Sequence, residues 1–187
     1  KMSLKAGSYR LDTNSGDLNV YTFKEGLLSK LAHDLLIDVT GFKVNLEVPE
    51  AGFASGSLEL EIQANSLKVI CALKDEEKTD ALKEKDIADI ERDMGVKVLH
   101  PDKYPTATFH SKSIQGKNGG YKISGDLSLH GVTKSIDFDI DTSGGNIKGM
   151  ITLLQKDYGI KPFKAMMGTL KIKNEINIDF DLPLNGT

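Results

Sequence analysis

Ser124–Ile140, with the sequence SGDLSLHGVTKSIDFDI, predicts two β-strands joined by a tight turn. Apolar and polar side chains alternate before and after Gly131, with the period of two that a half-buried strand requires. On the second strand Ile136, Phe138 and Ile140 share one face, while aspartates occupy the other. One face therefore meets water and the other an apolar interior. The function depends on whether side chains or a ligand fill that interior.

The same alternation extends over most of the chain and predicts about eight strands. A hairpin of strands 8–11 and 17–24 is expected around the turn-forming TNSGD, and a change of phase at Thr40–Gly41 predicts a β-bulge that curves the strand from Leu35 to Val48. Alternating strands with mostly short turns favour an antiparallel barrel or sandwich. A barrel of about eight strands either fills with side chains or encloses one small ligand. Other strands are expected at 57–64, 106–114, 146–154 and 170–182.

One long segment has a helical period instead. Ile87, Ile90 and Met94 lie at positions i, i+3 and i+7 between charged residues. They predict one helix of about four turns, with Thr79 as its N-cap and Gly95 at its end.

The length and composition indicate one domain. The chain has 187 residues, and its 24 basic and 27 acidic residues are interspersed, with a net charge of −3, so neither a nucleic-acid footprint nor a polybasic membrane patch is expected. The single cysteine, Cys71, excludes an internal disulfide and is expected to be a small buried side chain. No run of about 18 apolar residues predicts a transmembrane segment. Because no signal sequence is visible, we expect the cytoplasm, or the periplasm if a signal peptide has been removed.

Four stretches in order carry a family resemblance. LAHDLLIDVTGF around His33, PDKYPTATFHS at 101–111, ISGDLSLHGVTKSI at 123–136 and KDYGI at 156–160 resemble the motifs of the YceI-like family. The resemblance spans about residues 9–182. It implies a mainly β fold, an extended antiparallel eight-stranded lipocalin-like barrel with one α-helix in a connection. It also implies binding of a polyisoprenoid or another long-chain amphiphile. Together with the chain length, it predicts one domain over residues 1–187, with about residues 1–7 as a flexible tail.

The chain departs from the family pattern at two places. Near the start, Tyr9 and Asp12 are followed by Asn14-Ser15, where the family often has His-Ser. The segment EGLLSKL is an addition relative to common members, and its leucines predict a turn or two of amphipathic helix. Both departures bear on the barrel mouth and the head-group contacts more than on the fold.

The alternation and the resemblance together predict a ligand-binding interior. His33 is a family feature near the pocket, and Lys156 is a candidate cationic contact to a phosphate or carboxylate head group, next to Asp157 in an expected strand-end ion pair. The remaining candidates are apolar side chains that share the inner phase of their strands: Phe23, Leu35, Ile37, Phe42, Leu60, Ile62, Phe109, Leu127, Leu129, Phe138, Ile140, Ile151, Ile176, Ile178 and Phe180.

The histidines and methionines give weak signals for catalysis or metal binding. His33 and Asp34 are neighbours on a strand and point to opposite faces, so they do not form a catalytic pair. His100, His110 and His130 match no metal-ligand spacing and are interpreted as unrelated surface or turn residues. The adjacent methionines at 166–167 are expected to pack or to line an adaptable apolar surface rather than bind copper.

The leading hypothesis is a non-enzymatic protein that binds, sequesters or transports a long-chain amphiphile, a polyisoprenoid, quinone or fatty-acyl lipid. No nucleophile elbow, phosphate loop or dinucleotide fingerprint occurs, so no catalytic residue, cofactor or metal is expected. The alternative is an interaction protein with a side-chain-filled barrel and a partner-docking helix at 80–94. A third hypothesis is an enzyme that uses His33 on a lipid substrate. The oligomeric state is open, with a homodimer among the options.

Overall fold

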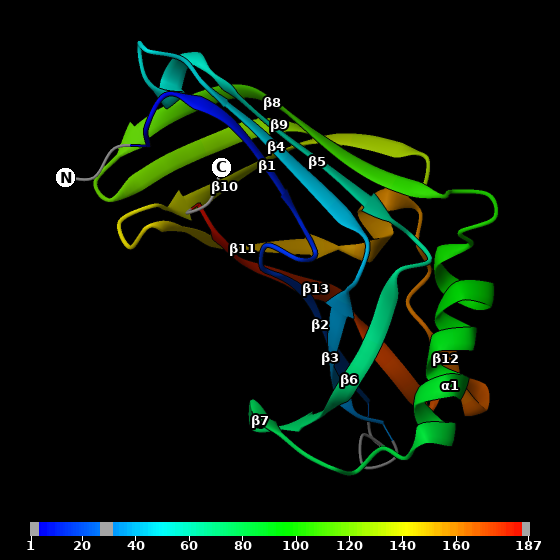
Figure 1. Cartoon of the computed structure of the whole chain (residues 1–187). Helices are drawn as coiled ribbons and strands as arrows, with labels where there is room; N and C mark the ends of the chain where they lie inside the picture. The colour runs from blue at the N-terminus through cyan, green and yellow to red at the C-terminus, as the bar shows by residue number, and fades with distance from the viewer. Residues whose placement is uncertain (1–3, 27–31, 185–187) are drawn as a thin grey trace.

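A computed structural model describes residues 4–26 and 32–184, in which one antiparallel sheet curls around an apolar interior and a helix lies at one end (Figure 1). The helical predictions within EGLLSKL lie mainly outside the described residues. The strands are β1 Gly7–Asp12, β2 Asp17–Glu25, β3 Asp34–Val39, β4 Phe42–Val48, β5 Ser57–Gln63, β6 Leu67–Lys74, β7 Glu77–Lys78, β8 Thr106–Lys117, β9 Gly120–Leu129, β10 Val132–Asp141, β11 Asn146–Leu154, β12 Lys164–Ala165 and β13 Leu170–Pro183.

The sheet is a half-barrel. Its strands follow the order β1-β4-β5-β8-β9-β10-β11-β13-β2-β3-β6-β7, with β12 beside β13. Within the described residues β1 pairs only with β4 and β7 only with β6, so the two ends of the sheet do not meet. The prediction of a mainly β, antiparallel, barrel-like fold with one α-helix in a connection is confirmed. The strand number exceeds the predicted eight, because one predicted strand is divided into β3 and β4 and because β6, β7 and β12 were not predicted.

The hairpin predicted around Gly131 is confirmed. β9 and β10 pair without a shift from Leu129↔Val132 to Gly120↔Asp141. His130 and Gly131 form the two-residue turn, with φ of 54° and 77°. Two positive φ angles are what a type I′ hairpin turn requires.

The hairpin predicted for 8–11 and 17–24 is wrong. β1 pairs with β4, whereas β2 pairs with β13 and β3 on the other side of the sheet. The turn itself exists, since Ser15 N–H donates to Asp12 O at 2.8 Å, but Thr13 Oγ1 donates to Thr40 O at 2.7 Å and redirects the chain. A local turn signal does not specify which strand becomes the partner.

The bulge predicted at Thr40–Gly41 is a complete break between β3 and β4. The neighbouring strands break at the same level, at 64–66 between β5 and β6. The sequence did not predict β6, because a register shift against β3 disturbs its alternation. Thr40 N–H donates to Ser66 O at 2.8 Å, and Gln63 N–H donates to Gly41 O at 2.9 Å. These bonds hold the bend between the two parts of the sheet.

The helix is shorter and later than predicted. α1 covers Glu84–Asp93 and continues as a π-helical segment, η3, over Met94–Leu99. Thr79 is not its N-cap, because Thr79 N–H and Oγ1 both donate to Ala72 O at 3.0 Å. The Asp86 carboxylate instead accepts from Lys83 N–H at 2.9 Å. The shorter helical segments are η2 Phe53–Ser55, η4 Gln155–Tyr158 and η5 Met166–Gly168.

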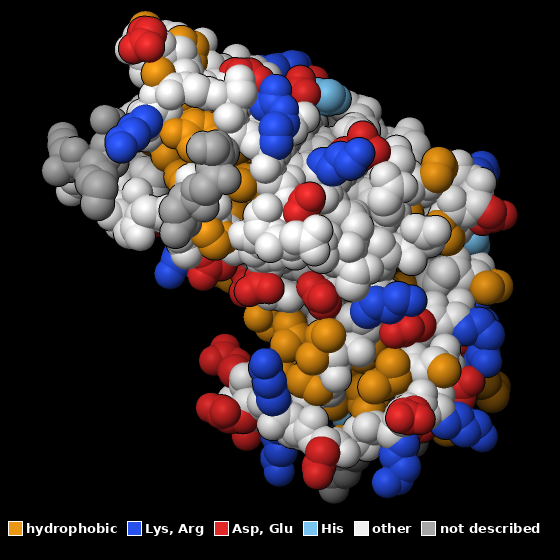
Figure 2. All heavy atoms as spheres, in the orientation of Figure 1, with side chains coloured by type: hydrophobic (Ala, Val, Ile, Leu, Met, Phe, Trp, Pro, Cys, Tyr) orange, Lys and Arg blue, Asp and Glu red, His pale blue; other side chains and the backbone are white. Residues whose placement is uncertain are grey.

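The outer face of β2, β3 and β6 carries an apolar row. Tyr21 of β2 lies opposite Leu36 of β3, which lies opposite Cys71 of β6. Figure 2 shows hydrophobic side chains reaching the surface over these strands. Cys71 is therefore half-buried, not fully buried as predicted. At the N-terminus, Leu4 packs against the core and Lys5 O accepts from Tyr9 Oη at 2.7 Å, within the segment expected to be a tail.

Candidate ligand-binding cavity

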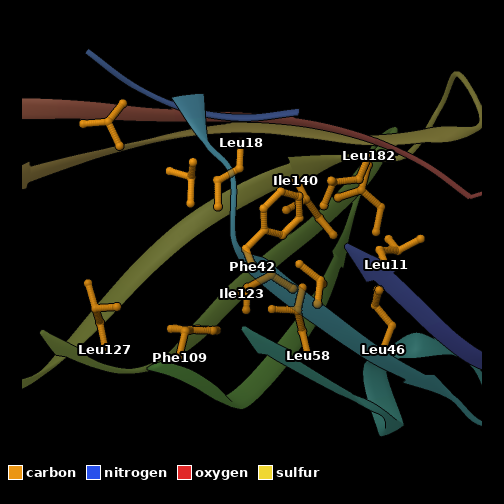
Figure 3. Close-up of a cluster of buried hydrophobic side chains, with 14 of the residues drawn as sticks. Leu11, Leu18, Phe42, Leu46, Leu58, Phe109, Ile123, Leu127, Ile140 and Leu182 are labelled. Carbon is orange, nitrogen blue, oxygen red and sulfur yellow. The ribbon is translucent and has the colours of Figure 1, made fainter. Parts of the chain in front are cut away.

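A cavity of about 70 Å³ lies inside the half-barrel. Figure 3 shows side chains from opposite walls converging there, Leu18 and Leu182 from one side and Phe109 and Leu127 from the other. Every lining residue is apolar: Leu18, Phe42, Val44, Leu58, Leu60, Ile62, Phe109, Leu127, Ile136, Phe138, Ile147, Ile151, Leu153, Ile178, Phe180 and Leu182. A cavity with such a lining favours hydrocarbon over water.

The lining has a buried part and a half-exposed part. Leu18, Ile147 and Leu182, for example, are at most 3% exposed. Seven lining residues are only half-buried: Leu60, Ile62, Ile136, Phe138, Ile151, Ile178 and Phe180. An apolar interior face that protein does not fully cover is a common feature of a binding site.

Three aromatic rings cross the cavity. The Phe138 ring centroid lies 5.2 Å from that of Phe109 and 6.3 Å from that of Phe180, both in edge-to-face arrangements. Two glycines make room for the outer rings. A Cβ at Gly125 would lie 2.7 Å from Phe109 Cζ, and one at Gly149 would lie 2.5 Å from Phe180 Cζ. Small residues on β9 and β11 thus allow large rings on β8 and β13.

The structure places part of the predicted interior around this cavity. The predicted residues that line it are Phe42, Leu60, Ile62, Phe109, Leu127, Phe138, Ile151, Ile178 and Phe180. Leu35, Ile37 and Ile140 are instead buried in the core, and Leu129 and Ile176 pack partly buried against it. Phe23 is half-buried and does not line the cavity.

The predicted set omitted several lining residues that the alternation could have found. Val44, Leu58, Ile136 and Leu182 each lie two residues from a predicted lining residue on the same strand, and Leu18, Ile147 and Leu153 share the inner phase of theirs. Their strand phase was available in the sequence. Their proximity to one cavity was not, because alternation gives the face of a side chain and not its depth.

The predicted head-group residues His33 and Lys156 do not line the cavity. His33 precedes β3 and is half-buried, and the neighbouring Asp34 carboxylate accepts from Lys24 N–H at 2.8 Å. Lys156 N–H donates to Asn174 Oδ1 at 2.8 Å. The expected ion pair of Lys156 with Asp157 does not form. Asp157 instead lies 3.9 Å from Lys134 Nζ of β10.

Two of the three histidines interpreted as unrelated lie together. The His130 ring centroid is 6.0 Å from that of His100 and 4.2 Å from that of Tyr104. Burial lowers the pKa of His130, and the nearby His100 and Lys103 act in the same direction, while a hydrogen bond to the Tyr158 backbone opposes them. The His130 Nε2 atom is buried and has no hydrogen-bond partner among the described residues.

Within residues 4–26 and 32–184, no group of three His, Cys, Asp or Glu side chains is placed to hold a metal ion. None of the helices within those ranges combines the length and the hydropathy that a transmembrane span requires.

Comparison with known proteins gives relatives over most of the chain. A UPF0312 protein of Shewanella denitrificans is 26% identical over 174 residues, 85% of this chain and 80% of that protein. A UPF0312 protein of Pseudomonas aeruginosa is 37% identical over 73 residues, and this match spans only 38% of that protein.

Solved structures share the fold. BcnA of Burkholderia cenocepacia superposes with a TM-score of 0.68 at 16% identity, over 92% of this chain and 98% of that one. A polyisoprenoid binding domain from Saccharophagus degradans gives a TM-score of 0.59 at 18% identity, over 95% and 97% of the two chains. The family model described as the YceI-like domain matches residues 9–184. This protein therefore belongs to the YceI-like family.

Proposed function

We propose that this protein binds a long-chain amphiphile, such as a polyisoprenoid, a quinone or a fatty-acyl lipid, and sequesters or transports it without catalysis. The half-exposed apolar part of the cavity lining is the observation that carries this proposal. The fold relative from Saccharophagus degradans, named as a polyisoprenoid binding domain, supports it.

The chemistry of the lining determines the class of ligand. With sixteen apolar lining residues, the cavity has no side chain to bind a polar group, so affinity would come from hydrocarbon burial. Each methylene removed from water contributes about 0.8 kcal/mol. A long tail therefore binds tightly without a specific polar contact, and its head group would stay outside the cavity.

The volume of the cavity sets a condition on binding. About 70 Å³ accommodates only a short part of a hydrocarbon chain, since a cavity of roughly 150 Å³ holds one benzene. A long tail would therefore lie along the half-exposed side chains and displace some of them. Phe138 is at the centre of the aromatic row and contacts both other rings, so its displacement would open the row on both sides.

The same small volume favours a second candidate, an interaction protein whose interior is filled by its own side chains. In that case α1 is the docking element. None of its residues is fully buried, and its exposed Arg92 pairs with Asp89 at 2.8 Å and with Asp93 at 3.4 Å.

Mass spectrometry decides between the two candidates. The natively purified protein would be measured as an intact complex, and its organic extract analysed for lipids. The carrier proposal predicts a long-chain lipid at about one copy per chain. A protein that carries no lipid and takes up neither prenyl nor fatty-acyl lipids would reject it in favour of α1-mediated docking.

A further inference from the structure

The hairpin of residues 164–171, called here the methionine hairpin, displays two apolar side chains to solvent. Met166 is 59% exposed and Met167 is 105% exposed. Both have a left-handed backbone, with φ of 52° and 56°, followed by Gly168 at 86°. Left-handed backbone is unfavourable for a residue with a Cβ. The fold thus accepts a strained turn that presents two methionines, with Thr169 Oγ1 donating to Met166 O at 2.7 Å to hold it.

Positive charge concentrates around this tip. Residues 160–174 contain four lysines and neither Asp nor Glu, in a chain whose net charge is −3. The net charge of the whole chain does not indicate this local excess of lysine, because acidic residues elsewhere outnumber the basic ones. Lys164 of β12 lies directly opposite Lys171 of β13. Like charges in that arrangement repel, so an anion near the hairpin stem would stabilise it.

The neighbouring elements do not neutralise this excess. Lys97 of η3 lies with its Nζ 5.7 Å from the centre of the Phe163 ring, which places another cation beside the hairpin. That lysine also pairs with Asp93 at 3.3 Å, and Glu25 of β2 lies opposite Lys171 in register. Asp93 and Glu25, with Glu175 two residues beyond Lys173 on β13, thus offset only part of the charge of five lysines: Lys97, Lys161, Lys164, Lys171 and Lys173.

We propose that the methionine hairpin docks the protein onto a lipid bilayer that contains anionic phospholipids. Exposed apolar side chains flanked by lysines fit the boundary between headgroups and acyl chains, where the apolar tip is buried and the cations meet lipid phosphates. Methionine is flexible and polarisable and adapts to such an irregular boundary. The two side chains enter the bilayer surface, and the four lysines of 160–174 contact its phosphates.

The position of the hairpin connects docking to the cavity. β13 begins in the hairpin at Leu170 and continues to Ile178 and Phe180, which line the cavity. A bilayer at the hairpin would therefore lie at the end of a cavity-lining strand. This connection rests on the proposed function, whereas docking itself does not require that the cavity bind a lipid.

Vesicle flotation tests the proposal with the full chain. We expect the protein to float with phosphatidylcholine vesicles containing about 30% phosphatidylglycerol, and much less with phosphatidylcholine alone or at high salt. Met166→Ser/Met167→Ser and Lys164→Gln/Lys171→Gln should each weaken this binding by about tenfold or more. Circular dichroism would verify that these surface variants are folded.

Matched variants elsewhere serve as controls. Met150 of β11 is 61% exposed, and Lys117 and Lys122 pair with aspartates across strands, at 2.7 Å and 3.8 Å. Met150→Ser and Lys117→Gln/Lys122→Gln should bind vesicles as the wild type does. Failure of the wild type to bind anionic vesicles, or equal losses in the hairpin and control variants, would overturn the proposal. Binding to an acidic protein without binding to anionic vesicles would also overturn it.

Discussion

The interior of the half-barrel is packed differently around Leu46 and Phe53, called here the closed end, and around the cavity, called here the middle. At the closed end, Leu46 is 0% exposed and Phe53 is 1% exposed, with the Phe53 ring 5.1 Å from Tyr121 in an edge-to-face contact. In the middle, Phe138 and Phe180 have the same inward phase but are only half-buried. β4 and β9 contribute to both regions, since Val44 and Leu127 also line the cavity, and the strands of both regions show the same alternation. The pattern therefore gives the direction of a side chain, whereas the spacing of the walls decides whether the interior is filled.

The largest expected effect on stability comes from the closed end. Leu46→Ala should lower the free energy of unfolding by about 2–5 kcal/mol, because it leaves a cavity that the surroundings cannot fill. Leu60→Ala is the matched change in the half-exposed lining and should cost about 1–2 kcal/mol, since less buried surface is lost. Urea unfolding would measure both. Equal losses would show that the middle is as tightly packed as the end.

Placing a charge in the middle should remove ligand binding. Phe138→Asp puts a carboxylate between Phe109 and Phe180, where the cavity lining has no polar group to pair with it. We expect bound lipid to disappear from the organic extract while the protein stays folded, at a cost in stability of about 1–3 kcal/mol. Asp137→Asn, at the neighbouring position on the outer face of β10, is the control and should retain lipid. A folded Phe138→Asp protein that keeps its lipid would contradict the assignment of this cavity.

A smaller change should narrow the cavity without adding charge. In Gly149→Ala the new Cβ would lie 2.5 Å from Phe180 Cζ and 2.8 Å from Asp139 O, so the ring must move. We expect a loss of about 1 kcal/mol from overpacking and a reduced uptake of long tails relative to short ones. Gly144→Ala offers a control, because a Cβ there meets nothing within 4 Å. If Gly144→Ala reduced the uptake of long tails as much as Gly149→Ala, displacement of the Phe180 ring would not be the cause of the reduction.

The local parts of the fold could be predicted from the sequence. The pairing around Gly131 follows from alternation on both sides of one turn, so every residue involved is close in the chain. The partner of β1 could not be predicted, because β1 ends at Asp12 and β4 begins only at Phe42, with two other strands between them in the chain. β6 escaped detection because its register shift opposite Leu36 and Ile37 breaks the alternation.

The candidate site could be predicted only in part, for the same reason. Side chains such as Phe109 and Ile178 were assigned to the interior from their phase, but nothing in the phase distinguishes them from Ile37, which packs in the core. The contact of His130 with Tyr104 was hidden because those residues belong to different motifs and meet only when β9 folds beside the connection before β8. Depth and long-range proximity are properties of the assembled sheet.

The smallest expected effect concerns His130, in the turn that follows β9. Tyr121, near the start of the same strand, packs at the apolar closed end, whereas His130 is a titratable ring. Because burial lowers the pKa of His130, the unfolded chain binds a proton at a pH where the folded protein does not. Stability should therefore be complete above the ordinary histidine pKa of about 6.5 and fall as the pH drops from there through the lowered folded-state pKa.

His130→Asn should abolish this acid dependence without disturbing the turn. Asn tolerates a positive φ and Asn-Gly is the favoured type I′ pair, so unfolding at neutral pH should be unchanged or slightly harder. Urea unfolding across the pH series would compare it with His110→Asn, which removes an exposed histidine near Glu59 on the outer face of β8. If the acid dependence persisted in His130→Asn, or vanished in His110→Asn, the buried Nε2 of His130 would not be its source. If it vanished only in His130→Asn, the acid dependence would be assigned to the turn that follows β9, where the buried imidazole must take up a proton for the folded protein to match the unfolded chain.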